Sequence, residues 1–155
     1  MNGFKTDLTK KILGLNPHIV IQPNNFVIDD EYILKLKKQF PDIKINKSFT
    51  GEGIIINNDN AKGVILKGIN KDEKKSIEFL NKNITSGNIK AFKKNQVFLG
   101  TELAYNLNLK EGDKINLMSS AFVATPLGSL PKQESFKIAG TFTTGFLEFD
   151  QNIVF

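Results

Sequence analysis

The sequence Thr125-Pro-Leu-Gly-Ser-Leu-Pro131 lies at the centre of the stretch that decides the fold, residues 113–144. Before it, residues 113–118 alternate polar and apolar side chains, and after it residues 135–143 do the same, as half-buried strands do. The sixteen residues between these runs, 119–134, show no helical period. Compact domains seldom keep an unstructured connection longer than about 12–15 residues unless it has a function. We therefore predict two strands joined by a functional loop.

The two prolines of this loop predict a stiff projection. A proline fixes φ and removes a backbone donor, so Pro126 and Pro131 are expected outside the middle of a sheet. Pro126 and Gly128 suit the second and fourth places of a type I turn. Leu127 and Leu130 are then predicted to lie at an exposed tip and to offer apolar side chains to a partner. The alternative is a loop that folds back on its own domain and buries both leucines.

The bulk composition is that of a globular domain. The chain has 155 residues, 40% hydrophobic and 24% charged, which is enough for one domain or two small lobes. All 21 basic residues are lysine. Because arginine usually makes the bidentate contacts to guanine and phosphate, the net charge of +5 is weak support for a nucleic-acid partner. The absence of cysteine excludes disulfides and cysteine-based zinc sites. The sequence has no apolar run of about 18 residues and no signal peptide.

Periodicity and turn residues predict an α+β fold with a mostly antiparallel sheet. Helices are expected at residues 4–15, from Asp29 or Asp30 to Phe40, at 71–83, and at 101–107 with Thr101 as the cap. Besides the two strands that flank the loop, strands are expected at 18–22, 43–49, 53–57, 63–69, 97–100 and 146–155, with a hairpin turn at 57–60 and a loop at 86–88. A strand that runs to the last residue has no polar stop, so we expect a piece of a longer protein, cut at Phe155, and a second cut at Met1 stays open.

The sequence predicts no catalytic site, cofactor or metal. His18 is the sole histidine, and a hydrogen-bonded strand residue is the simpler interpretation than a metal ligand. Glu148 and Asp150 share one face of a predicted strand, which would suit an acid/base pair, although acidic neighbours on a solvated edge are commoner. Gly51-Glu-Gly53 lacks the following helix and lysine of a phosphate-binding loop. We therefore expect a protein that is not itself an enzyme.

Three segments resemble one family of membrane proteins. Residues 1–17, Met1-Asn-Gly-Phe-Lys-Thr-Asp-Leu-Thr-Lys-Lys-Ile-Leu-Gly-Leu-Asn-Pro17, resemble the segment that follows the first membrane helix in the LolC/LolE lipoprotein-releasing permeases. A second segment resembles the MacB-like periplasmic core that many FtsX-like permeases share: Val97-Phe-Leu-Gly-Thr-Glu-Leu-Ala104, with Leu107, Leu109, Gly112, Asp113 and Ile115. The third, residues 125–131 followed by Gln133, Phe136 and Gly140-Thr-Phe142, is similar to the LolC-type hook.

The resemblance implies the periplasmic domain of a LolC/LolE-type ABC permease, an inner-membrane protein. Such a domain has a porter lobe near the membrane and an inserted, strand-rich sabre lobe. Carried over by position, residues 1–70 with 149–155 would belong to the porter lobe, whose C-terminal part would lie beyond this chain. Residues 71–148 would form the sabre lobe, with 119–134 as the hook loop.

The resemblance also implies partners and a contact surface. The hook, which would capture a periplasmic lipoprotein carrier, would consist of Thr125, Pro126, Leu127, Gly128, Ser129, Leu130 and Pro131. Asn116 and Gln133 would form a contact pad beneath it. Asn116 and Glu134 stand where basic residues are expected, so shape and apolar contact would carry more of the binding.

By the same resemblance, lipoproteins would be the substrates. A second permease subunit, identical or paralogous, would complete a dimer. A separate cytoplasmic ATPase would hydrolyse ATP. No nucleic-acid partner is expected. Two alternatives stay open. One is another MacB/FtsX-like permease, for efflux or cell division. The other is a soluble, non-enzymatic binding module with affinity for anionic polymers.

Overall fold

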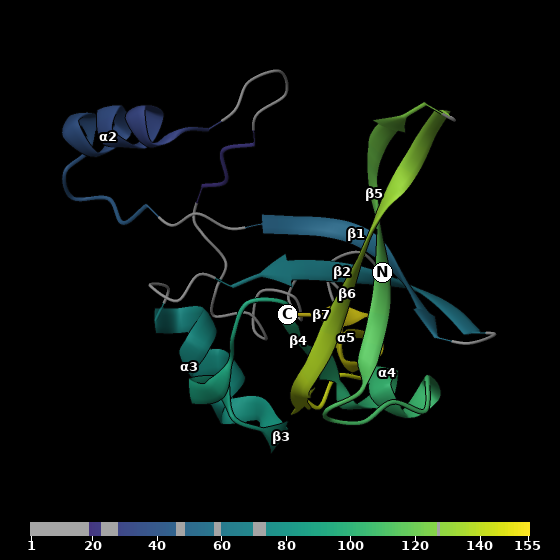
Figure 1. Cartoon of the computed structure of the whole chain (residues 1–155). Helices are drawn as coiled ribbons and strands as arrows, with labels where there is room; N and C mark the ends of the chain where they lie inside the picture. The colour runs from purple at the N-terminus through teal and green to yellow at the C-terminus, as the bar shows by residue number, and fades with distance from the viewer. Residues whose placement is uncertain (1–18, 23–27, 46–48, 58–59, 70–73, 127) are drawn as a thin grey trace, which may run out of the picture. The chain divides into compact units, whose positions relative to one another are not determined.

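The computed structural model of the chain describes residues 19–22, 28–45, 49–57, 60–69, 74–126 and 128–155 (Figure 1). The chain divides into two compact units, Met1–Lys47 and Ser48–Phe155. The predicted helix at 4–15, His18 and Leu127 lie outside the described residues. Among the helices that are described, none is long and apolar enough to cross a membrane.

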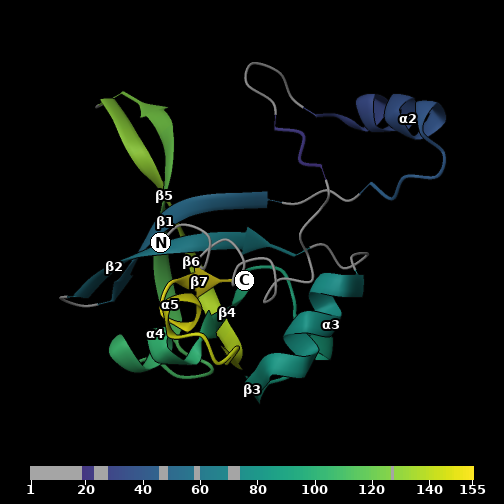
Figure 2. The same ribbon diagram turned by 180° about the vertical axis from the view of Figure 1, so that it is seen from behind.

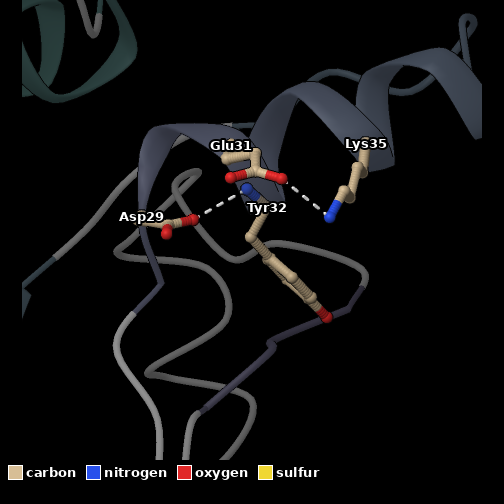
Figure 3. A network of polar contacts seen from close by, with 4 residues as sticks. All are labelled: Asp29, Glu31, Tyr32 and Lys35. Atoms are coloured by element: carbon tan, nitrogen blue, oxygen red, sulfur yellow. Dashed lines mark hydrogen bonds and ion pairs between the residues drawn. The ribbon is translucent and has the colours of Figure 1, made fainter.

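Helix α2 (Asp30–Gln39) is the helix described in the first unit. Asp29 begins it, because its carboxylate accepts a 2.8 Å hydrogen bond from the backbone N–H of Tyr32 and so satisfies one of the donors that a helix start leaves free. One turn further on, Lys35 Nζ lies 2.9 Å from Glu31 Oε1 (Figure 3). Both side chains are exposed, so this ion pair adds little stability. The predicted second helix and its acidic cap are confirmed.

The second unit is built on a sheet that closes on itself. Its strands are β1 (Phe49–Asn57), β2 (Asn60–Gly68), β3 (Ile84–Gly87), β4 (Gln96–Gly100), β5 (Lys114–Thr125), β6 (Gly128–Phe142) and β7 (Ile153–Val154). Their order is β3-β6-β4-β7-β2-β1-β5, and β5 also pairs with β6. The six strands other than β3 therefore form a ring. Among the described strands the β2–β7 and β4–β6 pairings are parallel and the others antiparallel, so the predicted α+β fold with a mostly antiparallel sheet is confirmed.

Two hydrophobic clusters lie on the two faces of this closed sheet. The first fills the ring, since every ring strand contributes to it and helix α4 (Thr101–Asn106) adds Leu103 and Ala104; its strand members are Ile55, Val64, Val97, Leu99, Ile115, Leu117, Ile138 and Val154. The second contains Phe98, Phe142 and Phe155 and lies under helix α3 (Lys74–Asn83) and the short helix η1 (Ile89–Ala91). Strand β4 alternates between the two, because Phe98 points away from its neighbours Val97 and Leu99.

Several predicted elements are confirmed with small shifts. The helix predicted at 71–83 is α3, and the buried strand predicted at 97–100 is β4. The hairpin predicted at 57–60 joins β1 to β2, with Asn57 opposite Asn60. The helix predicted after β4 is α4, but its N-cap is Gly100. Thr101 does not cap it, because its hydroxyl donates instead to the carbonyl oxygen of Phe142, 3.0 Å away.

Three strand predictions are wrong. Residues 19–22 and 43–45 are not in strands, and Ile19 is 74% exposed, so these apolar runs have no neighbouring strand to pack on. Residues 146–155 form helix α5 (Leu147–Asp150) and the short strand β7 instead of one strand. The turn that leads from β6 into α5 is stabilised by hydrogen bonds to the buried Asp150 carboxylate, a tertiary feature that no local pattern shows.

The loop predicted at 86–88 is also partly wrong, since Ser86 and Gly87 belong to β3 and pair with β6. Gly87 has a φ of +89°, and a Cβ there would lie 2.1 Å from the carbonyl oxygen of Ala139. The glycine that suggested a loop is therefore required by a close approach of two strands.

The ring also bears on the predicted lobes. Strands β1 and β2, which fall within the predicted porter segment 1–70, lie in the same closed sheet as β5 and β6 from the predicted sabre segment 71–148. The boundary between the two compact units lies between Lys47 and Ser48. The assignment of segments to a porter and a sabre lobe stays a prediction.

Gly100 provides a test of the packing between β4 and α5. A Cβ at this position would lie 2.0 Å from the carbonyl oxygen of Asp150, and backbone cannot move aside cheaply. Gly100→Ala is expected to lower the free energy of unfolding by about 2 kcal/mol or more, which thermal unfolding followed by circular dichroism would register as a melting temperature about 4–8 °C lower.

Gly63→Ala is the matched control in β2, because no atom lies within 4 Å of its Cβ position. Its stability is expected to stay the same or to rise by up to about 1 kcal/mol. Equal melting temperatures for the two variants would contradict the close contact at Gly100.

Candidate partner-binding site

The stretch predicted as a loop, 119–134, is mostly a β-hairpin. Strands β5 and β6 pair from Lys114 opposite Lys137 to Thr125 opposite Gly128, which leaves a two-residue turn. β1 pairs with β5 at residues 116–119, and β4 pairs with β6 from Lys137 onward. The outer part of the hairpin, residues 120–136, is therefore a two-stranded ribbon that projects beyond the ring (Figures 1 and 2), and we call it the arm.

The prediction of an unstructured loop is wrong. Strands were predicted only where polar and apolar residues alternate, and the arm lacks that alternation. A ribbon with no core on either face needs no regular alternation of polar and apolar residues. Pro131 lies in β6 opposite Phe122. A strand of a two-stranded ribbon has one open edge, where the missing donor of proline costs no ladder hydrogen bond.

The structure describes most of the predicted hook at the tip of the arm. Pro126, Gly128 and Ser129 are exposed, and Pro131 is half-buried. Gly128 has a φ of +116°, a backbone conformation that favours glycine. Leu130 is 52% exposed and so is not packed into the core of its own domain. The side chain of Thr125, like the whole of Leu127, lies outside what the structure describes.

The two predicted pad residues lie together at the base of the arm. Asn116 lies opposite Ser135, and Gln133 lies opposite the residue two places after Asn116. Opposite residues, and residues two apart on one strand, share a face of the sheet, so Asn116 and Gln133 are diagonal neighbours on the outer face. Both are exposed, and Asn116 Oδ1 accepts a 2.5 Å hydrogen bond from Ser135 Oγ.

Sequence reasoning missed the apolar neighbours of this pad. Ile54 of β1 lies opposite Met118 of β5, which in turn lies opposite Gln133, so all three share one row on the outer face. Ile54 is 42% exposed. The continuous apolar run of residues 54–56 was the available signal, since a strand that is apolar on both faces is expected to have apolar neighbours on both.

The charges at the base of the arm differ between its two faces. Glu134 stands where a basic residue was expected, and its Oε1 lies 2.8 Å from Lys132 Nζ. Both residues alternate with Gln133 along β6, so this ion pair lies on the face opposite the pad. On the face of the pad, Lys114 lies opposite Lys137, two positions from Asn116 and Ser135, and both lysines are exposed.

Asp150 is not one half of an acid/base pair. Glu148 is exposed, whereas Asp150 is 2% exposed, so the two do not share an open face as predicted. The Asp150 carboxylate accepts hydrogen bonds from the backbone N–H of Thr144 at 2.9 Å, from the Thr144 hydroxyl at 2.7 Å and from the N–H of Gly145 at 3.2 Å. Its role in this structure is to fix the turn that leads from β6 into α5.

Lys67 connects β2 to α5 on the other side of this turn. Its Nζ lies 5.8 Å from the centroid of the Phe149 ring, within range of a cation–π interaction. Desolvation by burial lowers the pKa of Lys67 from its ordinary value. The lysine therefore serves packing, with the aromatic face offsetting part of the cost of burying its charge.

The comparisons with known proteins agree with the motifs. No protein-family model matches the chain. The "Lipoprotein-releasing system transmembrane protein LolC" of Xylella fastidiosa is 21% identical over 99% of this chain, and that of Neisseria meningitidis serogroup B is 23% identical over 99%. An uncharacterized membrane protein of Buchnera aphidicola subsp. Schizaphis graminum is 28% identical over 76% of it. The chain spans 38% of the length of the LolC proteins and 30% of the Buchnera protein.

These relatives are membrane proteins, and two of the three take part in the release of lipoproteins by their names. The LolC matches extend over nearly the whole chain, including the middle segment that carries no recognisable motif. They confirm the resemblance to the LolC/LolE-type lipoprotein-releasing permeases that the core and hook motifs indicate.

The hydrogen bonds from Thr144 and Gly145 to the Asp150 carboxylate, which we call the Asp150 clasp, contribute measurably to stability. Asp150→Ala removes the acceptor of two backbone N–H groups and one hydroxyl, and is expected to lower the free energy of unfolding by about 2–3 kcal/mol. Chemical denaturation in urea, followed by circular dichroism, measures this. Glu148→Ala on the same helix is the control and is expected to stay within about 0.5 kcal/mol of the unmodified chain. If both variants unfolded at the same urea concentration, the clasp would not be a stabilising feature.

Proposed function

We propose that this chain is the periplasmic domain of the membrane subunit of an ABC transporter that releases lipoproteins from the inner membrane. In this proposal a periplasmic carrier docks on the arm and receives the lipoprotein there. The observation that carries the proposal is the projecting arm with Leu130 exposed near its tip, in a chain that resembles LolC over nearly its full length. Such an arm offers a binding surface without exposing the core of the ring.

The tip is suited to insertion into an apolar cavity. Burying one exposed leucine in a partner is worth roughly 1.5–3 kcal/mol, or about ten- to a hundredfold in affinity. The turn is held by the pairing of Thr125 with Gly128 and by the fixed φ of Pro126. A braced turn loses less conformational entropy on binding than a flexible loop, so more of the contact energy appears as affinity.

The pad would complete the docking surface. Asn116 and Gln133 present amide groups beside Met118 and Ile54. A carrier that binds the tip would also contact these polar and apolar side chains at the base of the arm. The uncharged amides of the pad and the apolar side chains beside them favour contact by shape and apolar area, and the exposed Lys114 and Lys137 are the charges next to this surface.

The remaining partners follow from the same proposal. Lipoproteins are the substrates, and a second permease subunit, identical or paralogous, forms the dimer. A separate cytoplasmic subunit hydrolyses ATP, so the chain itself is not an enzyme. The chain lies in the periplasm and is attached to the inner membrane by other parts of the same polypeptide.

The tip leucine is the direct test of docking. Leu130→Asp places a charge where an apolar side chain would enter the carrier, and is expected to weaken binding of the purified carrier from the same bacterium by about tenfold or more. Leu127→Asp is expected to do the same. Isothermal titration calorimetry measures the affinity, and thermal unfolding is expected to show an unchanged melting temperature.

Leu147→Asp on α5 is the matched control, because Leu147 is 58% exposed and receives the same substitution. It is expected to bind the carrier as the unmodified chain does. A large fall in the melting temperature of Leu130→Asp would mean that this leucine belongs to the core, which would contradict a docking role.

The salt dependence of binding tests the nature of the pad. Because the contacts proposed for the tip are apolar and the pad residues Asn116 and Gln133 are uncharged, raising sodium chloride from about 50 to about 500 mM should change the Kd for the carrier by less than about threefold. Heparin, measured in parallel, tests the alternative of a module that binds anionic polymers, which predicts steeply salt-dependent affinity. A carrier affinity that fell steeply with salt would show that charge steers the docking.

A further inference from the structure

Strand β5 has two more residues than β6 at the point where the arm leaves the ring. Met118 lies opposite Gln133, and the next pair toward the tip is Phe122 opposite Pro131. Between these pairs β5 has three residues, 119–121, and β6 has one, Lys132. The difference, three minus one, is a β-bulge of two unmatched residues on β5.

The bulge coincides with the rim of the ring. Ser119 is the last residue of β5 that pairs with β1, and it lies opposite Gly53. Pairing of β5 with the ring therefore ends within the bulge. A bulge bends the strand that carries it and increases the local twist, and in Figure 1 the two strands of the ribbon cross near the level of β1 before they continue as the arm.

A glycine fixes where the bend begins. A Cβ on Gly53 would lie 3.0 Å from the carbonyl oxygen of Met118 and 3.1 Å from Leu66 Cδ1. β1 thus approaches β5 closely at the residue that precedes the bulge. β5 stays paired with β1 up to Ser119, and its two unmatched residues lie among the three that follow Met118.

The size of the excess also matters. Successive positions of a strand alternate between two faces, so an excess of one residue would interrupt the alternation along β5 and shift it by one position beyond the bulge. An excess of two leaves the faces unchanged. The bulge can therefore alter the direction of the arm without altering which positions of the arm share a face with the pad.

We propose that the two-residue excess in β5 aims the arm so that its tip and the pad contact one carrier molecule at the same time. This inference rests on the proposed function. Leu130 lies beyond the bulge, whereas Asn116 and Gln133 lie before it. Since Leu130 is three residues from Gln133 along β6, the two alternate to opposite faces of the strand. The bend and added twist at the bulge therefore set the angle between the two contact regions. Residues 119–121 are in this sense a positioning element that need not touch the carrier.

Deletion of Ser120 and Ala121 tests the inference. It leaves Ser119 alone opposite Lys132, which gives β5 and β6 equal numbers of residues and keeps every position on its face. The variant is expected to fold but to bind the carrier about tenfold or more weakly, because tip and pad no longer meet one partner in a prearranged geometry. The control is the exchange Ser120→Ala with Ala121→Ser, which keeps the length and composition and is expected to bind normally.

The direction of the arm can be measured without the carrier. The chain has no cysteine, so spin labels at Ser129→Cys on the arm and Tyr105→Cys on α4 are unambiguous. The distance distribution from double electron–electron resonance is expected to shift in the deletion variant and to stay unchanged in the exchange variant. An unshifted distribution in the deletion variant, or a shifted one with undiminished carrier binding, would overturn the inference.

Two further outcomes are covered. If the unmodified chain fails to bind the carrier, the proposed function fails, whereas the distance measurement still decides whether the bulge aims the arm. If the deletion variant does not fold, insertion of Ser-Ala after Lys132 equalises the strands in the opposite way, with three residues on each. The insertion variant is expected to show a shifted distance and weakened binding, and the absence of either would count against the inference.

Discussion

The pairing of β5 with two neighbours is the constraint on which the rest of the structure depends. β5 pairs with β1 at residues 116–119 and with β6 over most of its length, which closes the sheet. A closed sheet has one interior to fill, and the apolar residues of six strands together with Leu103 and Leu107 near α4 fill it. Since the ring satisfies most of its own backbone groups, the arm can extend into solvent without exposing the core.

Two of the three segments that resemble the family, the core motif and the hook motif, correspond to two different structural tasks. Residues 97–104 supply β4 and the start of α4, with Val97 and Leu99 in the interior of the ring and Phe98 in the cluster outside it. Residues 125–131 supply the tip of the arm. A motif of the first kind specifies how the ring is packed and is expected wherever that ring occurs, whereas the second specifies what the arm presents. For this reason the residues of the tip are a stronger indication of function than the residues of the core.

Local patterns predicted the elements whose environment is local. Helices α2 and α3 follow from the spacing of their apolar residues, and the turn of Asn57 to Asn60 follows from its asparagines. The end of the chain was misjudged because its path depends on Asp150, whose hydrogen bonds to Thr144 arise only once β6 and α5 are in place. The arm was misjudged for the opposite reason: its described residues 124, 126 and 128–130 are exposed, and nothing requires such residues to alternate between polar and apolar.

The candidate site was predicted in part, but its arrangement was not. The arrangement of the tip relative to the pad depends on two strands together. The residues of the tip and the pad could be named from the sequence, but their relation depends on the number of residues in β5 and β6 between Met118 and the turn. That count has meaning only when both strands are read in register. It follows that likeness at the tip does not by itself preserve a docking geometry between relatives. Insertion or deletion of one residue within 119–121 would leave residues 125–131 intact and yet change the bulge, and with it the bend and twist at which the arm leaves the ring.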